Sequence, residues 1–149
     1  MNTDIKINMS KIITIHTDGA SRGNPGHASA AFVVIDEKNK TIFEYSKYLG
    51  IKTNNEAEYA AALLAHNWLQ TNINELTGDE IQFKFDSELI TRQLNGQYKI
   101  KSPSLLPIAK KILEIKKELS IPISYQHVRR EHNALADKLA NKAIDKEIK

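Results

Sequence analysis

The sequence predicts a single α/β domain built on a five-stranded mixed sheet flanked by helices. Three short runs rich in β-branched residues open the chain, and the turn segments that join them are typical of an antiparallel meander. Helical periodicity then alternates with two further β-rich runs, and parallel strands require such crossover connections. The expected element order is strand, strand, strand, helix, strand, helix, helix, strand, helix.

The first half of the chain supplies the meander and the first helix. The runs expected as strands are Lys11–Thr17, Ala28–Asp36 and Lys40–Tyr48. The segment Gly19–Gly26 is rich in turn-forming residues, so we expect it to connect the first two strands. Alanine and leucine at helical spacing predict a helix over Glu56–Leu69, and cap-type residues precede it at Thr53–Asn55.

The second half alternates strands with helices. Its expected elements are a strand over Ile81–Phe85, a short helix over Ser87–Leu94, a longer helix over Ser104–Leu119, a strand over Ile121–Val128 and a last helix over Ala134–Lys146, capped by Asn133. Residues 1–10 are polar and predict an amino-terminal extension. No repeat or linker divides the rest, so residues 11–149 are expected to form one domain.

Composition excludes several classes of protein. The 149 residues include no cysteine, which excludes disulfide scaffolds, thiolate zinc sites and cysteine nucleophiles. No apolar run approaches the roughly 20 residues of a membrane span, so we expect a cytoplasmic protein without a membrane partner. Residues 1–98 include nine basic and twelve acidic residues, whereas residues 99–149 include twelve basic and six acidic ones. A basic half suits a polyanion, although charged helix faces are often merely solvated.

Four carboxylates stand where strands end or helices begin. Asp18 and Asp86 follow the first and fourth strands, Glu58 shares a helix face with alanines, and Asp137 lies in the first turn of the last helix. Each alone is explained by a turn, an N-cap or the helix dipole. A mixed sheet can bring all four to one edge, where they would repel one another without a cation. An all-oxygen ligand set favours Mg²⁺ or Mn²⁺ over zinc.

Four segments resemble, in the right order, the motifs of type I ribonuclease H. They are Thr17–Gly26 (TDGASRGNPG), Thr53–Leu63 (TNNEAEYAAAL), Phe85–Ile90 (FDSELI) and His127–Asn141 (HVRREHNALADKLAN). The resemblance implies an RNase H-like fold and an endonuclease that cuts the RNA strand of RNA–DNA hybrids, leaving 5′-phosphate and 3′-hydroxyl ends. It implies two Mg²⁺ ions, which Mn²⁺ can replace, held with substrate by Asp18, Glu58, Asp86 and Asp137. We expect a monomer.

The resemblance also assigns substrate contacts. Residues implied to approach the ribose backbone and minor groove are Gly19, Ser21, Asn24, Asn54 and Asn55. Thr53 would bind a phosphate of the DNA strand with help from Ser102, and Arg129 or Arg130 would contact phosphate. For Asn54 and Asn55, simple helix capping is the alternative interpretation.

Two features depart from the family pattern. The basic helical protrusion of many members is replaced by the short interval Gly96–Pro103, so affinity should be lower and strongly dependent on salt. Lysines expected to compensate in part are Lys99, Lys101, Lys110 and Lys111. The loop before the last helix is short, and His132, directly before Asn133, is the candidate for activating water or releasing product, with Glu131 as the alternative.

Three other functions remain open at this point. A compact site could also cleave double-stranded RNA or ribonucleotides embedded in DNA. A non-catalytic hybrid-binding module is disfavoured, because such a module has no need to concentrate carboxylates beside phosphates. A nucleotide-binding domain that uses Gly19–Gly26 as its phosphate loop is disfavoured as well, because the segment matches neither glycine-rich motif and joins two antiparallel strands.

Overall fold

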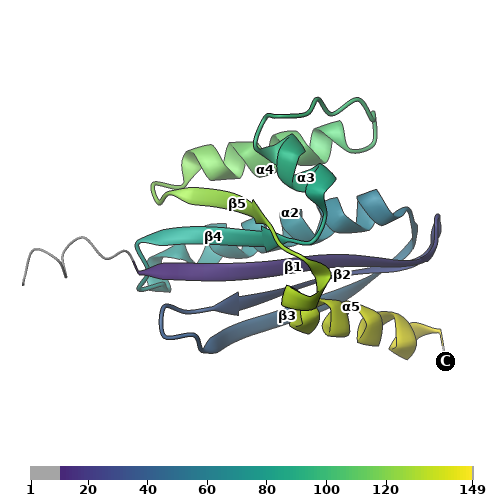
Figure 1. Cartoon of the computed structure of the whole chain (residues 1–149), viewed down its shortest axis with the longest axis horizontal. Coiled ribbons are helices and arrows are strands. Elements are labelled where there is room, and N and C mark those ends of the chain that lie inside the picture. Colours follow the sequence, from purple (N-terminus) through teal and green to yellow (C-terminus); the bar gives the residue numbers. More distant parts are fainter. Residues whose placement is uncertain (1–10, 149) are drawn as a thin grey trace, which may run out of the picture.

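The computed structural model describes residues 11–148, and the expected extension over residues 1–10 lies outside them. The strands are β1 (Ile12–Gly23), β2 (Gly26–Ile35), β3 (Thr41–Lys52), β4 (Glu80–Phe85) and β5 (Ile123–His127). The helices are α2 (Asn54–Asn72), α3 (Glu88–Leu94), α4 (Leu106–Glu118) and α5 (Ala134–Glu147), with 3-10 turns at Ile73–Glu75 and Arg130–His132. The predicted order of elements is confirmed (Figure 1).

The five strands form one mixed sheet in the order β3-β2-β1-β4-β5. The pairs β1–β2 and β2–β3 are antiparallel, whereas β1–β4 and β4–β5 are parallel. Strand β2 is buried continuously from Ala28 to Val34, so both faces of the sheet must be covered there. Helix α2 covers one face and packs against α4, while α5 lies across β1, β2 and β3 on the other (Figure 1).

The largest difference from the expected elements is the length of β1. The first strand was expected to end at Thr17 and leave Asp18 at its end, but β1 continues to Gly23. The turn-rich residues after Thr17 stay extended because each pairs with β2, from Asp18 opposite Ala31 to Gly23 opposite Gly26. The turn itself is only Asn24-Pro25, which are joined by a cis peptide bond. Asp18 therefore lies inside a strand and is buried, at 4% exposed.

Two other boundaries differ from expectation. Strand β3 continues past Tyr48 to Lys52, because its pairing with β2 resumes after an irregularity next to Gly50. Helix α4 begins at Leu106, not Ser104, since Ser102 to Leu105 form a turn in which Leu105 and Leu106 donate to the Ser102 carbonyl. The interval between α3 and α4 contains no helix among the described residues, in line with the predicted absence of a protrusion.

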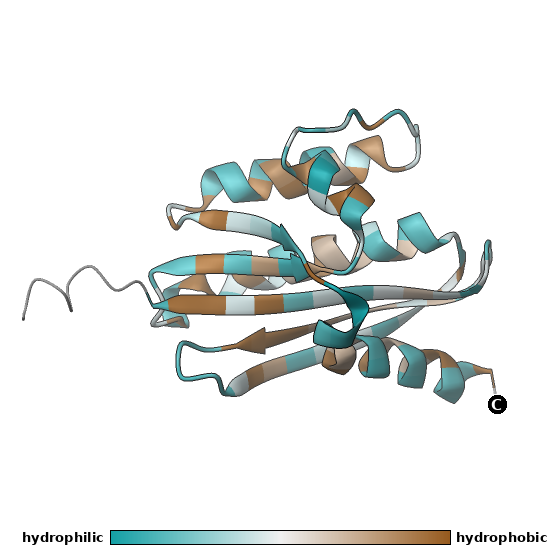
Figure 2. Ribbon diagram, viewed as in Figure 1, coloured by the Kyte–Doolittle hydropathy of each residue, from teal (hydrophilic) through white to brown (hydrophobic). Residues whose placement is uncertain are grey.

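The core lies between the sheet and α2. Figure 2 shows apolar residues concentrated along the strands, where isoleucine and phenylalanine side chains from β1 and β4 are fully buried. His66 of α2 is buried among them, stacked on Phe83 with ring centroids 4.2 Å apart. Its Nδ1 lies 2.7 Å from the Ala62 carbonyl and its Nε2 lies 2.8 Å from the Tyr125 hydroxyl. The neutral ring satisfies both partners, so His66 is a structural residue of the core.

No helix among residues 11–148 is both long enough and apolar enough to cross a membrane.

Burial of His66 predicts a stability that falls in acid. Burial lowers the pKa of His66 from 6.5 to about 4, so the unfolded chain binds an extra proton between these values. This contribution to the free energy of unfolding is complete above pH 6.5 and is lost as the pH falls toward 4, by at most about 1.4 kcal/mol per pH unit. Urea unfolding measures the free energy of unfolding of the native protein and of His66→Leu. The difference between these two free energies should narrow with decreasing pH.

His132→Leu, at an exposed histidine, is the control and should run parallel to the native protein. A His66→Leu profile that also runs parallel to the native one would contradict the prediction.

Candidate metal and nucleic-acid site

Three of the predicted carboxylates converge at the end of the parallel strand pair. Pairing between β1 and β4 stops at Thr17 opposite Phe85. The next residues are Asp18, still within β1, and Asp86, the first residue after β4. Glu58 reaches the same point from α2. One oxygen of each carboxylate lies within 4.8 Å of the others, so the three side chains could hold a metal ion together. Their all-oxygen, hard donor set fits Mg²⁺ or Mn²⁺.

Gly19 allows α2 to bring Glu58 this close. A Cβ atom on Gly19 would lie 2.2 Å from the Ala57 carbonyl carbon and 2.3 Å from the Glu58 nitrogen. The Gly19 amide also donates a hydrogen bond to the Glu58 carboxylate. The resemblance implied that this glycine admits the ribose backbone, and the structure supplies a different reason for it, namely close packing of β1 against the α2 backbone.

The fourth carboxylate, Asp137, lines a polar cavity of about 190 Å³ together with Asp18. The residues lining this cavity are Asp18, Gly19, Ala20, Ser21, Asn54, Arg130, Asp137 and Asn141. Asn141 is one turn after Asp137 on α5, and its Nδ2 lies 3.3 Å from Oδ1 of Asp137. Asn141 was not identified from the sequence. Its spacing of four residues along one helix face is the signal that could have identified it.

Electrostatics of the cluster favour a cation. Burial, followed by repulsion from Glu58 and Asp86, raises the pKa of Asp18 to about 10. Burial and repulsion from Asp86 raise the pKa of Glu58 to about 8, although the Gly19 amide and the charge of Arg130 oppose that shift. Without a bound cation these two carboxyl groups retain protons near neutral pH, and a divalent ion would compete with those protons.

A second polar cavity, of about 490 Å³, adjoins the amino-terminal end of α2. Its lining contains five of the predicted substrate residues together with three others: Asn24, Thr53, Asn54, Asn55, Glu56, Ser102, Ser104 and Leu105. Asn54 lines both cavities, so they adjoin at this end of the helix. Ser104 was missed; its hydroxyl lies 3.0 Å from that of Ser102.

Thr53 is the N-cap of α2 and forms a capping box with Glu56. Its hydroxyl accepts from the Glu56 amide at 3.1 Å, and the Glu56 carboxylate accepts from the Thr53 amide at 2.9 Å. Asn54 and Asn55 are the first residues of the helix and are exposed, so the alternative that they serve as caps is wrong. Asn24 also contributes here, because its side-chain oxygen accepts from the Asn54 amide at 3.0 Å and ties the β1–β2 turn to the helix.

The predicted site residues in the segment before α5 lie in different places. Arg130 lines the carboxylate cavity, whereas Arg129 is exposed and lies 3.9 Å from Glu131. His132 does not reach that cavity; with Glu131 it lines a separate one of about 190 Å³ beside His16. Because the loop is short, the 3-10 turn Arg130–His132 directs Arg130, and not His132, toward the carboxylates.

Asn133 was expected to cap α5, and the structure bears out its position but not a capping side chain. It occupies the N-cap position, but its side chain makes no hydrogen bond to the helix. The side chain is buried against the sheet and contacts β1 and Asp86.

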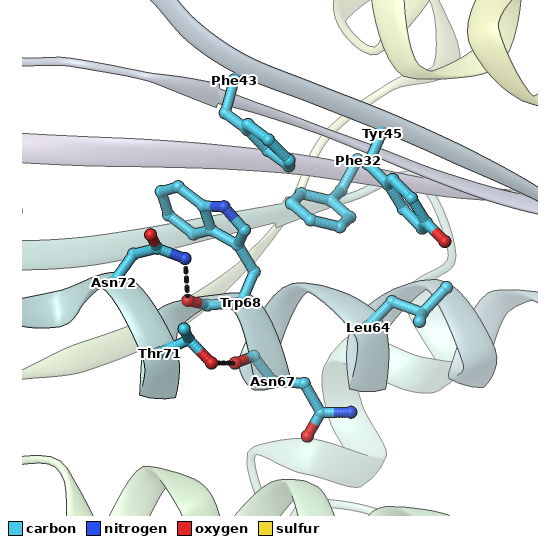
Figure 3. Close-up of a pocket in the computed structure, with 8 residues that line it drawn as sticks. All are labelled: Phe32, Phe43, Tyr45, Leu64, Asn67, Trp68, Thr71 and Asn72. Atoms are coloured by element: carbon cyan, nitrogen blue, oxygen red, sulfur yellow. Dashed lines mark hydrogen bonds between the residues drawn. The ribbon is translucent and has the colours of Figure 1, made fainter.

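The most apolar cavity lies elsewhere and holds no part of this site. It has a volume of about 300 Å³ and lies between α2 and strands β2 and β3 (Figure 3). Phe32, Phe43 and Trp68 form its base, and Asn67, Thr71 and Asn72 of α2 form its rim. None of its lining residues is a carboxylate, a histidine or a base, in contrast to the cavity that Asp18 and Asp137 line.

Comparison with known proteins identifies the family. Residues 16–143 match the model of a family described as reverse transcriptase-like. The structure of LC11-RNase H1, solved in complex with an RNA/DNA hybrid, superposes with a TM-score of 0.86 at 45% identity, covering 92% of this chain and 99% of that one. The chain belongs to the ribonuclease H1 family. RNase H1 from Halobacterium salinarum is similar as well, with a TM-score of 0.81 and 32% identity over 91% of this chain and 95% of that one.

Curated relatives of this ribonuclease H1 domain are longer proteins. Ribonuclease HI of Halobacterium salinarum is 35% identical over 128 residues, which cover 86% of this chain and 62% of that protein. The bifunctional protein Rv2228c of Mycobacterium tuberculosis is 34% identical over 134 residues, which cover 89% of this chain and 35% of the relative. The chain therefore spans between about a third and two thirds of the length of these relatives.

The packing of Gly19 predicts that even one added methyl group will disrupt the site. Gly19→Ala should force α2 away from β1, lowering the free energy of unfolding by about 1–3 kcal/mol and weakening Mn²⁺ binding. Urea denaturation and calorimetric Mn²⁺ titration measure the two effects. Ala20→Gly, which adds no atom at the next position of β1, should retain Mn²⁺ binding. A Gly19→Ala protein with native stability and native affinity would show that the close approach is not required.

The raised pKa values predict that the metal-free protein loses stability in base. A group whose pKa is raised on folding stabilises fully below its unfolded pKa, near 4, and loses that contribution as the pH rises toward 8 to 10. In EDTA, the free energy of unfolding should therefore fall from pH 6 to pH 9. At pH 9 Asp18→Asn should be more stable than the native protein by about 1–2 kcal/mol, or roughly 3–6 °C in Tm.

Thermal unfolding of both proteins, with Asp79→Asn as an exposed control far from the site, tests this expectation. Added Mn²⁺ should stabilise the native protein and not Asp18→Asn. An Asp18→Asn protein less stable than the native one in EDTA at pH 9 would contradict the electrostatic argument.

Proposed function

We propose that the protein is an endoribonuclease that hydrolyses the RNA strand of RNA–DNA hybrids, leaving 5′-phosphate and 3′-hydroxyl ends. The observation that carries the proposal is the convergence of Asp18, Glu58 and Asp86 beside two polar cavities that share Asn54. Membership of the ribonuclease H1 family and the hybrid bound to LC11-RNase H1 support it.

The carboxylates would hold the metal ions. Asp18, Glu58 and Asp86 would bind one divalent cation in common, and Asp137, in the same cavity as Asp18, would bind a second together with it. Mg²⁺ is the proposed ion, with Mn²⁺ able to replace it. When bound, such ions supply the Lewis acidity that phosphodiester hydrolysis requires. Arg130, in the same cavity, is positioned to attract the scissile phosphate toward an otherwise negative site.

Recognition of the hybrid would be divided between the two polar cavities. The RNA strand would lie in the carboxylate cavity, with Ser21 and Glu58 near 2′-hydroxyl groups and Asn54 at the boundary. The DNA strand would place a phosphate in the second cavity, against Thr53 and Ser102. In this proposal one copy of the chain supplies both cavities and acts as a monomer.

The basic residues fit a duplex that is held by its phosphates. Lys99 and Lys101 lie in the segment that leads to Ser102, so they flank the second cavity. Arg129 is exposed next to Arg130, in a long ion pair with Glu131, and would meet the backbone of the RNA strand. In this proposal His132 does not activate water, since it lines a different cavity. Affinity should then depend steeply on salt, because neutralised phosphates release counterions.

The decisive experiment is cleavage of a labelled RNA–DNA hybrid in Mg²⁺. The native protein should cut the RNA strand internally, and Asp18→Asn should lose at least about 100-fold in rate, because it removes the carboxylate shared by both proposed ions. Asp79→Asn, an exposed acid at the opposite end of β4, should cut as the native protein does. Undiminished cleavage by Asp18→Asn would refute the proposal.

The same assay separates the alternative substrates. A double-stranded RNA and a DNA duplex with one embedded ribonucleotide should be cut more slowly than the hybrid. Equal rates on all three would show that the site does not select hybrids, and binding of the hybrid without cleavage would favour a binding module.

A further inference from the structure

Asn133 connects the sheet to two of the carboxylates. It is buried, at 1% exposed, between the 3-10 turn and α5. Its Nδ2 donates to the Thr17 carbonyl at 2.8 Å and lies 3.3 Å from Oδ2 of Asp86. Its backbone carbonyl accepts from the Asp137 amide at 3.1 Å, in the first turn of α5. One residue thus contacts the Asp86 carboxylate and the backbone that carries Asp137.

His16 determines how the Asn133 amide is oriented. Carbonyl and carboxylate oxygens only accept, so Nδ2 must face Thr17 and Asp86, and Oδ1 must face the other way. On that side the His16 Nδ1 lies 3.0 Å from Oδ1. Since an amide oxygen cannot donate, Nδ1 of His16 carries the hydrogen, in the neutral ring and in the imidazolium alike.

His16 itself is held within the sheet. His16 pairs with Val33 of β2 on one side and with Lys84 of β4 on the other, so its backbone lies within the sheet. It is two residues before Asp18, and alternate residues of a strand point to the same face. The hydrogen-bonded chain therefore runs from the strand that carries Asp18 to Asp86 and α5.

We propose that His16 is a positioning residue, which holds the Asn133 side chain so that Asp86 and the first turn of α5 are oriented toward Asp18 for cation binding. The inference rests on the proposed function for its role in catalysis, but the effect on cation binding is independent of the substrate. Without a donor at position 16, Oδ1 of Asn133 would be a buried acceptor with no partner. The amide could then rotate and place an oxygen against the Asp86 carboxylate, which would repel it.

Three variants test the proposal. His16→Phe keeps an aromatic ring and removes the donor, and His16→Asn places an amide N–H near the position of Nδ1. His27→Phe is the matched control, because His27 is exposed on the adjacent strand and its Nδ1 contacts the Tyr48 hydroxyl at 2.7 Å, away from the carboxylates. Calorimetric titration with Mn²⁺, in the absence of nucleic acid, gives a Kd for each protein, and thermal unfolding shows that each is folded.

We expect His16→Phe to weaken Mn²⁺ binding roughly 10-fold, as removal of a residue behind a metal ligand commonly does. His16→Asn should restore most of the affinity, and His27→Phe should match the native protein. On a hybrid substrate, His16→Phe should lower kcat and leave KM unchanged, because the substrate contacts are elsewhere. Native Mn²⁺ affinity in folded His16→Phe, or an affinity in His16→Asn as weak as in His16→Phe, would overturn the proposal.

Two further outcomes distinguish the positioning role of His16 from the proposed function and from a folding defect. If the native protein binds Mn²⁺ and the variants follow the expected order, but no hybrid is cut, the positioning role stands and the proposed function fails. If His16→Phe does not fold, His16→Asn is compared with His16→Gln, whose amide lies one carbon farther from the strand. Equal Mn²⁺ affinities for these two would overturn the proposal, and weaker binding by His16→Gln would support it.

Discussion

The parallel pairing of β1 with β4 is the constraint on which the site depends. It ends at Thr17 and Phe85, and it brings Asp18 of β1 close to Asp86, the first residue after β4. Two carboxylates so placed repel each other, and Glu58 adds a third negative group. The backbone hydrogen bonds of the sheet and the buried side chains beneath it must hold these groups together against that repulsion, because the described residues place only Arg130 among them as a cation.

The core on the α2 side supplies the rigidity that this arrangement needs. Phe83 and Phe85 of β4 are fully buried, and His66 stacks on the first of them. Gly19 lets the α2 backbone approach β1 without an intervening side chain, so the helix and the strand act as one unit. Raised pKa values at Asp18 and Glu58 are the consequence, and they make the site responsive to both protons and cations. Stability and cation binding are therefore coupled through the same few side chains.

Much of the fold and the carboxylate set could be predicted because the relevant signals are local. Period-two and period-3.6 patterns identified every strand and α-helix of the described residues, with errors mainly at their ends. The extension of β1 to Gly23 was missed because glycine, serine and asparagine indicate turns in sequence, whereas pairing with β2 keeps them extended. Thr53 as cap followed the ordinary rule, but Asn133 did not, since a buried carbonyl and a carboxylate compete for its amide.

The sequence by itself determined the order of elements, the acids that could bind a cation and the family whose motifs they form, because these depend on residue types at short spacing. Only the tertiary structure decided which side chains meet. It brought Arg130 to the carboxylates and kept His132 apart, joined two cavities through Asn54, and linked His16 to Asn133 across 117 positions of the chain. Such contacts depend on strand register and helix packing, which short-range sequence patterns do not encode.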